Sequence, residues 1–310
     1  MTIRTIIAAA ALVAMALPTV AQERITYKSA KAGSSYYQMG VQLAEALKGS
    51  VDMTIEESQG SVQNVMEVRA RGADYVFTTP PGLIAAAQGA TGPFEDKGAP
   101  AFDGIRALFP IPSLTMHFVV DADSGIESFA DMAGKTILLG SGSFGAREGA
   151  KYLGLFGVED EVTVADAELS NAVSALKNGQ IDGFVTAGSY PAPNVIEAAA
   201  STGVRVLSLS DAQIAETGRT RLVIPAGTYA GQDADVVTTS LPVMAFATEA
   251  MSEDTAYALT KAFWENKQSL GGSAAWWDGV TPEMVGNALT EIHPGAARYY
   301  EEIGVSLPQG

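Results

Sequence analysis

The stretch from Thr136 to Phe156, TILLGSGSFGAREGAKYLGLF, holds the structural unit from which the rest of the fold is predicted. It begins with a short apolar run, Thr136 to Leu139, which fits a buried strand. A loop of small residues, Gly140 to Gly145, follows, and the segment Gly145 to Phe156 has the spacing of an amphipathic helix. A strand, a tight loop and a helix in this order predict one βα step of an α/β fold.

The same order recurs on both sides of this stretch. The candidate strands are Ile25 to Lys28, Met53 to Glu56, Tyr75 to Thr78, Ile105 to Phe109, Thr115 to Val120, Val162 to Val164, Gly183 to Thr186, Val204 to Leu207 and Pro242 to Thr248. Helical patterns lie between them, for example Tyr37 to Leu47, Val62 to Arg69 and Leu169 to Leu176. This alternation predicts βαβ units in mainly parallel sheets with helices on both faces. After Thr248 the pattern changes to helices only, beginning with a long amphipathic helix that Ser252 caps.

Composition limits the class of protein. The chain has 310 residues, 47% of them hydrophobic and 17% charged, and it contains no cysteine. These values predict a globular chain of two compact units that needs no disulfides. Nineteen basic residues against 35 acidic ones give a formal charge of -16. Such a surface repels polyanions, which argues against a nucleic-acid partner.

The first 21 residues have the pattern of a signal peptide. Arg4 precedes an uninterrupted apolar run from Ile6 to Leu17, and Thr19-Val20-Ala21 places small residues at the positions that a signal peptidase reads. The apolar run stops at Pro18, which makes it too short to span a membrane. We therefore expect cleavage after Ala21 and a periplasmic product, free of any lipid anchor because no cysteine is present.

Loops of small residues precede helices at four places. These loops are Gly33 to Tyr36, Gly60 to Val62, Gly140 to Gly145 and Ala187 to Ser189. The first N–H groups of a helix have no partner within the helix and carry part of its positive dipole, and small residues allow a ligand to approach them. Ordinary N-caps explain any single loop equally well. Four such loops together predict a site for a carboxylate or a phosphate.

Two segments share one plan: a helix end, a glycine, an aspartate, a short apolar strand and a threonine. They are Arg71 to Thr78 and Asn178 to Thr186. Each places a hydroxyl group at the carboxyl end of a buried strand, which is where open α/β sheets bind ligands. An internal duplication explains this pairing, although helix-glycine-strand joints are common in α/β proteins.

The alternative to a ligand-binding protein is an enzyme, namely an oxidoreductase. Gly140, Gly142 and Gly145 fit a dinucleotide fingerprint, Asp166 follows near the spacing of a ribose-binding acid, and Tyr257 with Lys261 could form a catalytic pair. The predicted export and the amphipathic helix around Tyr257 argue against this alternative. With no cysteine and only two histidines, other catalytic arrangements are sparse. His117 fits a satisfied buried histidine and His293 a helix cap, so we expect no enzyme, no cofactor and no metal.

Several segments together carry a family resemblance. They are GSSYYQMG (33–40), ESQGSVQN (57–64), VDADSGI (120–126), IPAGTYAGQDADV (224–236) and HPGAARYYE (293–301). With these segments the chain resembles the extracytoplasmic solute receptors of the TAXI class of TRAP transporters, over nearly the whole mature chain. The resemblance implies a bilobed periplasmic-binding-protein fold, capture of a small anionic solute and delivery to a sodium-coupled membrane permease. It suggests glutamate-like or 2-oxo dicarboxylate ligands.

Two departures from the family pattern fall in the expected cleft. Family members often carry a Pro-Gly-rich third loop and a Gln-Ser pair after the third strand. This chain has Gly140-Ser141-Gly142-Ser143-Phe144 and Thr78-Thr79-Pro80 at those places. The identity of the solute therefore stays open, as does the alternative of a sensor that kept the receptor fold.

The loops and the resemblance together predict two lobes with a ligand between them. Residues 22–118 and 241–310 form the first, residues 119–240 the second, and the hinge lies near Val119-Val120 and Ser240-Leu241. The candidate ligand-binding residues are Ser34, Ser35, Tyr36, Gly60, Ser61, Thr78 and Thr79 in the first lobe, and Ser141, Gly142, Ser143, Arg147, Thr186, Ala187 and Gly188 in the second, with Tyr229 as a lid or wall.

These residues have different expected roles. We expect the backbone N–H groups of Ser34, Ser35, Ser61 and Ser143 to bind carboxylate oxygens. The hydroxyl groups of Thr78 and Thr186 orient the ligand, and Tyr36 packs on its carbon chain. Arg147 either faces the bound anion or pairs on the surface with an acid such as Glu148.

Overall fold

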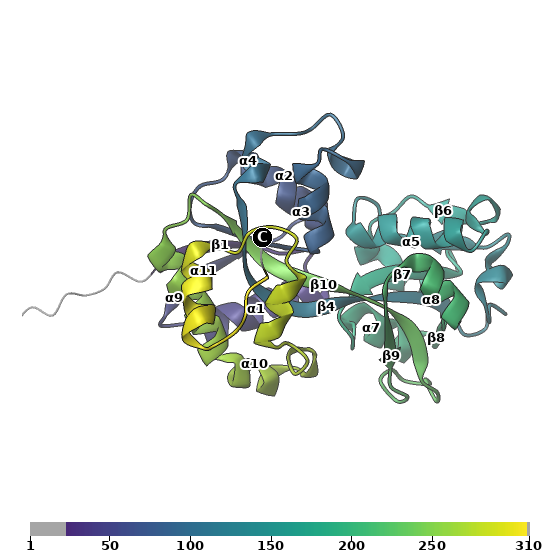
Figure 1. Cartoon of the computed structure of the whole chain (residues 1–310). Coiled ribbons are helices and arrows are strands. Elements are labelled where there is room, and N and C mark those ends of the chain that lie inside the picture. The colour runs from purple at the N-terminus through teal and green to yellow at the C-terminus, as the bar shows by residue number, and fades with distance from the viewer. Residues whose placement is uncertain (1–22, 309–310) are drawn as a thin grey trace, which may run out of the picture.

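The computed structural model describes residues 23–308, so the predicted signal peptide lies outside the described residues. The described chain forms two lobes, which the long strands β4 (Ile105–Asp121) and β10 (Val236–Thr248) connect (Figure 1). The strands form one ten-stranded sheet in which β2-β1-β3-β10-β4-β7-β5-β6 are consecutive neighbours. Strand β8 adds to β4 and β9 to β10.

The first lobe combines the beginning and the end of the chain. Its parallel strands are β1 (Glu23–Lys28), β2 (Val51–Glu56) and β3 (Tyr75–Thr79). Its helices are α1 (Ser35–Ala46), α2 (Ser61–Glu67), α3 (Pro81–Gln88) and α4 (Pro100–Asp103), together with the C-terminal α9 (Glu253–Glu265), α10 (Lys267–Ser273) and α11 (Pro294–Glu302). The ring of Phe109 in β4 stacks on that of Phe263 in α9, with centroids 4.2 Å apart, so the C-terminal helices belong to this core.

The second lobe is formed by the middle of the chain. Its strands are β5 (Thr136–Leu138), β6 (Thr163–Ala165), β7 (Gly183–Gly188), β8 (Val204–Val206) and β9 (Thr220–Ile224). Its helices are α5 (Phe144–Leu155), α6 (Ala172–Lys177), α7 (Pro193–Ser201) and α8 (Asp211–Thr217). The predicted βα step is confirmed, because β5 is followed by a glycine loop and by α5. A separate apolar cluster, including Phe184 and Val195, packs in this lobe.

The prediction of mainly parallel sheets holds for the outer strands and is wrong for the central ones. Strands β4 and β10 run antiparallel to each other and to β7, β8, β9 and β3, which makes five of the nine strand pairs antiparallel. The reason is topological. One strand leaves the first lobe and the other returns, so two neighbouring connections between the same lobes point in opposite directions.

The central strands are also longer than predicted. Ile105 to Phe109 and Thr115 to Val120 are parts of one strand, because β4 continues through Pro110 opposite Met244 with a shift of register nearby. Strand β9 was not predicted. Its sequence TRLVI is only half-apolar, and it becomes a strand through its pairing with β10. At Thr115 the strand β4 pairs with both Ser240 of β10 and Gly188 of β7, so the connections between the lobes begin there.

Among residues 23–308, no helix is both long enough and apolar enough to cross a membrane.

Candidate functional site

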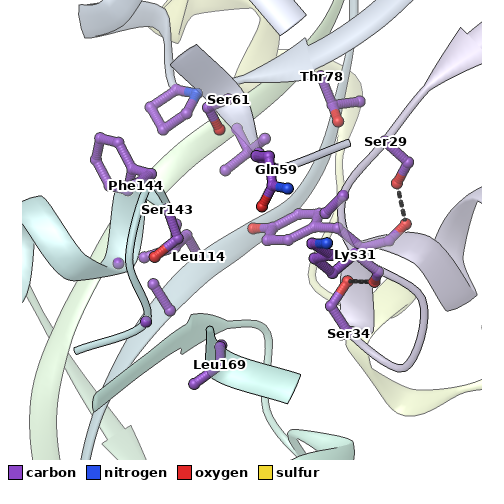
Figure 2. A pocket seen from close by; sticks show the side chains of 18 of the residues that line it. Ser29, Lys31, Ser34, Gln59, Ser61, Thr78, Leu114, Ser143, Phe144 and Leu169 are labelled. Carbon is purple, nitrogen blue, oxygen red and sulfur yellow. Dashed lines mark hydrogen bonds between the residues drawn. The ribbon is translucent and has the colours of Figure 1, made fainter. Parts of the chain in front are cut away.

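Two adjoining cavities lie between the lobes, and Figure 2 shows the smaller of them. Their volumes are about 90 Å³ and about 190 Å³, and both are lined by Lys31, Ser34, Leu169 and Ala187. We call the smaller one the inner cavity and the larger one the outer cavity. Each receives residues from both lobes, and the inner cavity also touches Leu114 of β4 and Val243 of β10. The cleft that the sequence predicted therefore exists at the junction of the lobes.

Helix α1 begins at this cleft. Ser34 is its N-cap, and its hydroxyl oxygen accepts the N–H of Tyr37 at 3.2 Å. The side chain of Tyr36 lines the inner cavity, and its hydroxyl group donates to the carbonyl oxygen of Pro112 at 3.1 Å. Burial raises the pKa of Tyr36, so this side chain is a neutral wall of the cavity.

Helix α2 begins at the same cavity. Gly60, its N-cap, has a φ of +123°, which side-chain-bearing residues rarely adopt. Gly60 and Ser61 both line the inner cavity, and a Cβ at Gly60 would lie 3.9 Å from the backbone nitrogen of Phe144 in the second lobe. The backbone conformation therefore favours glycine here, and the two lobes come into contact beside it.

Helix α5 faces them from the second lobe. Ser143 is its N-cap and accepts the N–H of Ala146 at 2.9 Å. Ser143, Phe144 and Gly145 line the inner cavity opposite α2. A Cβ at Gly145 would lie 3.0 Å from that of Ala187, so this glycine allows α5 to pack closely on β7. Three helix N-termini from two lobes thus meet at one cavity, an arrangement suited to an anion.

The backbone donors at these termini differ in part from those predicted. The N–H groups of Ser34 and Ser143 already donate to the carbonyl oxygens of Lys31 and Gly140, at 3.1 and 3.2 Å, so the prediction for these two is wrong. In both loops the N–H of the cap residue closes the turn that precedes the helix, so it is not available to a ligand. Within the described part of the chain, the N–H groups of Ser35, Ser61 and Phe144 have no protein acceptor. These groups are the donors that remain for a ligand.

Strand β3 contributes one of its two threonines. Thr78 lines the inner cavity, whereas Thr79 is fully buried and lines neither cavity, because neighbouring residues of a strand point to opposite faces. Behind Thr78 the buried Asn64 donates its amide to the carbonyl oxygens of Ser29 and Thr78, at 2.7 and 3.0 Å. One amide therefore holds the ends of β1 and β3 together beneath the cavity.

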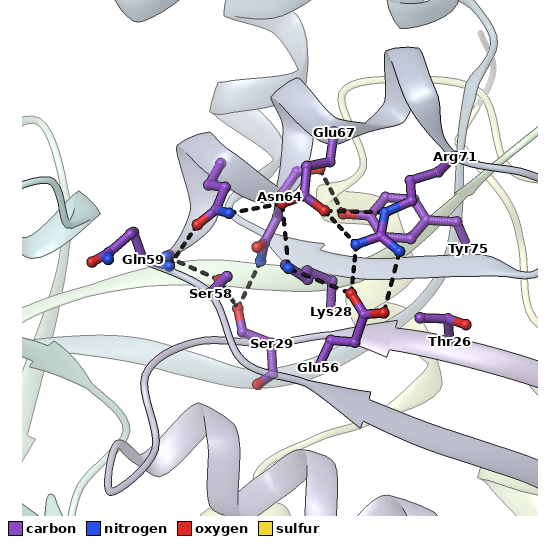
Figure 3. A network of polar contacts seen from close by, with 12 residues as sticks. Thr26, Lys28, Ser29, Glu56, Ser58, Gln59, Asn64, Glu67, Arg71 and Tyr75 are labelled. Carbon is purple, nitrogen blue, oxygen red and sulfur yellow. Dashed lines mark hydrogen bonds and ion pairs between the residues drawn. The ribbon is translucent and has the colours of Figure 1, made fainter.

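A partly buried polar network fixes the loop before α2 (Figure 3). The side-chain oxygen of Gln63 accepts the N–H of Gln59 at 2.8 Å, and its amide group donates to Glu67 at 2.7 Å. Glu67 and Glu56 both bind Lys28 and Arg71. Hydrogen bonds from Arg71, opposed by partial burial, lower the pKa of Glu56. The network therefore stays ionised and gives the loop of Gln59 a rigid base.

Strand β7 brings three predicted residues to the outer cavity, namely Thr186, Ala187 and Gly188. The hydroxyl oxygen of Thr186 accepts the amide of Asn194 at 3.1 Å. The buried Ser35 of the first lobe accepts the N–H of Ser189 at 3.1 Å, which links the lobes. A Cβ at Gly188 would lie 2.5 Å from the Ser35 hydroxyl oxygen, so only glycine fits beside this link.

Besides Thr79, three predicted residues lie away from both cavities. Gly142 is exposed at the tip of its loop. Arg147 is also exposed; its guanidinium lies beside Gly92 of the first lobe, and Glu148 pairs with Arg219 at 2.7 Å instead. The hydroxyl group of Tyr229 lies 2.8 Å from the His117 Nε2 and accepts the N–H of Ala192 at 2.9 Å, so this side chain is core rather than a lid.

Two charged residues and one amide at the inner cavity were not predicted. Lys31 follows β1, Gln59 follows β2 and Glu168 follows β6, and all three line the inner cavity. The Lys31 Nζ lies 3.1 Å from a Glu168 carboxylate oxygen across the cleft, and the Gln59 amide lies 3.5 Å from the other oxygen. A signal for them existed, because the carboxyl ends of the parallel strands converge at one edge of a sheet.

The glycine loop after β5 has the local form of a dinucleotide fingerprint, and Asp166 follows the neighbouring strand β6. Asp166, however, already accepts the hydroxyl group of Ser141 at 2.9 Å. Tyr257 and Lys261 lie on α9 of the first lobe, where both bind Glu302. They therefore do not face the glycine loop as a catalytic pair.

The comparisons with known proteins agree on one fold. A family model described as the NMT1-like family matches residues 28–304. Among solved structures, MatC from Rhodopseudomonas palustris with bound malate is 13% identical, with a TM-score of 0.55 over 86% of this chain and 91% of that one. The periplasmic binding protein BugD is 11% identical, with a TM-score of 0.53 over 92% and 99%. A structure described as a periplasmic transporter is 11% identical, with a TM-score of 0.55 over 92% and 93%. The chain therefore has the bilobed α/β fold of periplasmic binding proteins.

Proposed function

Because this chain belongs to the NMT1-like family, we propose that it is the solute-binding subunit of a membrane transporter and captures a small carboxylate between its two lobes. The observation that carries this proposal is the convergence of the N-termini of α1, α2 and α5 on one cavity. Unpaired N–H groups at such positions bind carboxylates without a full charge on the protein.

The cavity suits a small organic acid with an apolar part. Leu114, Phe144, Leu169 and Val243 line one cavity together with the hydroxyl groups of Ser61 and Thr78. A carboxylate at the helix N-termini places the carbon chain against these apolar side chains. Glutamate-like amino acids and 2-oxo dicarboxylates both have this form, in line with the resemblance to TAXI receptors.

Binding is coupled to closure of the lobes. A ligand that contacts Ser61 on one side and Phe144 on the other favours the closed state by its difference in affinity between the two states. The pairing of β4 and β10 near Thr115 and Ser240 is where a hinge would bend. In this proposal the first lobe consists of residues 22–118 and 241–310, and the second of residues 119–240.

The transport partner follows from the same resemblance. The closed receptor delivers its solute to a TRAP-type, sodium-coupled permease in the membrane. Export by a signal peptide that is cleaved after Ala21 places the receptor in the periplasm, where it can meet this permease.

A thermal unfolding scan tests the ligand class. The mature chain is refolded from denaturant to remove any bound solute and is then scanned with amino acids, dicarboxylates, 2-oxo acids and NAD. A solute at 100 times its Kd stabilises the chain by about 2.7 kcal/mol, which shifts the Tm by several degrees. A shift with carboxylates supports the proposal. A shift with NAD alone contradicts it, and so does a scan in which none of the carboxylates shifts the Tm.

A further inference from the structure

The charges around the two cavities are unevenly distributed. Their lining side chains include one cation, Lys31, and two carboxylates, Glu168 and Glu197. Lys31 is already paired with Glu168 at 3.1 Å. Glu57 accepts the N–H of Ala32 at 2.9 Å and so adds negative charge beside the loop that carries Lys31. The side chains of the cleft are therefore net negative, and the positive potential in it comes from the helix N-termini.

This distribution accommodates a zwitterion better than a dianion. The helix N-termini offer a place for one carboxylate. A second anionic group that reaches toward Leu169 meets the Glu168 carboxylate or has to compete with it for Lys31. An ammonium group in that place can share the Glu168 carboxylate with Lys31, because the two carboxylate oxygens together accept about four hydrogen bonds.

We propose that Glu168 is a specificity-determining residue that makes the cleft select an α-amino acid over the 2-oxo acid of the same carbon skeleton. This inference rests on the proposed function and narrows it. Glu168 lies on the loop after β6 and contacts Lys31 and Gln59 of the first lobe. It can therefore accept an ammonium group only where the two lobes come together, so recognition of the amino group and closure are one event.

Four probes in two matched pairs test the assignment: glutamate with 2-oxoglutarate, and leucine with 4-methyl-2-oxopentanoate. Each pair differs only in the amino and oxo groups. Isothermal titration gives the affinity ratio within each pair for the wild type and for Glu168→Gln, which keeps the size of the side chain and removes its charge. Glu127→Gln is the matched control, because Glu127 is an exposed carboxylate of the second lobe that pairs with Arg205 at 3.2 Å.

We expect the wild type to prefer the amino acid of the pair that it binds by at least tenfold. Glu168→Gln should reduce this affinity ratio at least tenfold. It should weaken binding of the amino acid and strengthen binding of the oxo acid, because Lys31 is then free to pair with the oxo acid. Glu127→Gln should leave the ratio unchanged. As a second variant, Lys31→Gln leaves Glu168 without its partner and should increase the ratio.

The possible failures are distinguishable. If the wild type binds none of the four probes and no other carboxylate of the panel, the proposed function itself fails. If it binds a pair without preference, or prefers the oxo acid, the role of Glu168 is wrong while the solute receptor stands. The same holds if Glu168→Gln changes the ratio by less than threefold, or if Glu127→Gln changes it as much.

Discussion

His117 shows at the scale of one residue how the second lobe is held to the crossing strand. Its ring is fully buried in β4, with Nδ1 3.1 Å from the carbonyl oxygen of Thr115 and Nε2 2.8 Å from the Tyr229 hydroxyl oxygen. Because that hydroxyl group accepts the N–H of Ala192, its own proton points to Nε2. This arrangement assigns the proton of a neutral imidazole to Nδ1. Burial lowers the pKa of His117 to about 4.

This pKa predicts a pH-dependent contribution to stability. The unfolded chain binds a proton at His117 below about pH 6.5, whereas the folded chain does not until about pH 4, so stability is lost as the pH falls between these values. The difference in unfolding free energy between the wild type and His117→Gln should shrink by about 2 kcal/mol from pH 7 to pH 4.5. Urea unfolding of both proteins at several pH values measures it, and the carboxylates common to both cancel. A difference that does not vary with pH would contradict the assignment.

Gly188 carries a second prediction at this scale. A methyl group there displaces the Ser35 hydroxyl group and breaks its bond with the Ser189 N–H between the lobes. Gly188→Ala should weaken the binding of the panel's best carboxylate about tenfold, which corresponds to about 1.4 kcal/mol. In a Ser35→Ala background the same change should have little effect, because the clash is gone. Gly82→Ala is the control, since a Cβ at Gly82 meets nothing within 4 Å. Equal losses in both backgrounds would exclude this mechanism.

At the scale of elements, Asn64 links helix α2 to the ends of β1 and β3. Its side chain is fully buried, and its amide donates to two carbonyl oxygens. Asn64→Ala leaves the Thr78 carbonyl without this donor, and we expect a loss of about 2 to 3 kcal/mol in unfolding free energy. Because Ser29 and Thr78 line the inner cavity, the affinity for the carboxylate should fall as well.

Asn266 offers the matched control for this measurement. Its amide donates to one carbonyl oxygen of the described residues, that of Ala262 at 2.9 Å, near the end of α9 and away from both cavities. Asn266→Ala should cost about 1 kcal/mol or less and leave the affinity unchanged. Denaturant unfolding and titration calorimetry compare the two variants. If Asn64→Ala lowers stability no more than Asn266→Ala, the linking role is wrong.

The sequence predicts some of the strands and site residues, and it fails for those that depend on a distant partner. The alternation of apolar runs and helical patterns predicted the outer strands, because each of them is indicated by its own short apolar or β-branched run. Strand β9 depends on a partner that lies beyond a loop, and the continuity of β4 through Pro110 depends on β10. Neither relation is contained in a local pattern. Thr78 and Ser61 were predicted at the cavity from the strand end and the loop in which each lies. The Lys31–Glu168 pair joins loops 137 positions apart, so no local pattern indicates it.

At the scale of the whole molecule, few polar contacts within residues 23–308 hold the lobes together across the cleft. They include the Lys31–Glu168 ion pair, the Gln59–Glu168 contact and the bond between Ser35 and Ser189. Surface ion pairs of this kind contribute about 1 kcal/mol or less. Without solute, the closed and open states should therefore differ by only a few kcal/mol. A solute that binds the closed state 100 times more tightly can convert a 1:10 population into 10:1.

This balance predicts the effect of one charge on the shape of the free protein. Lys31→Glu places a second carboxylate opposite Glu168 and should shift the unliganded chain toward the open state, with a larger radius of gyration in small-angle X-ray scattering. Lys48→Glu makes the same change of charge at a residue that pairs with Glu45 near the end of its own helix, at 3.7 Å, and should leave the radius unchanged. Raising the salt concentration should reduce the effect of Lys31→Glu, because the side chains of Lys31 and Glu168 are both partly exposed to solvent. Identical radii for the two variants at low salt would mean that the Lys31–Glu168 pair does not control closure, and the bond between Ser35 and Ser189 would then be the contact to remove next.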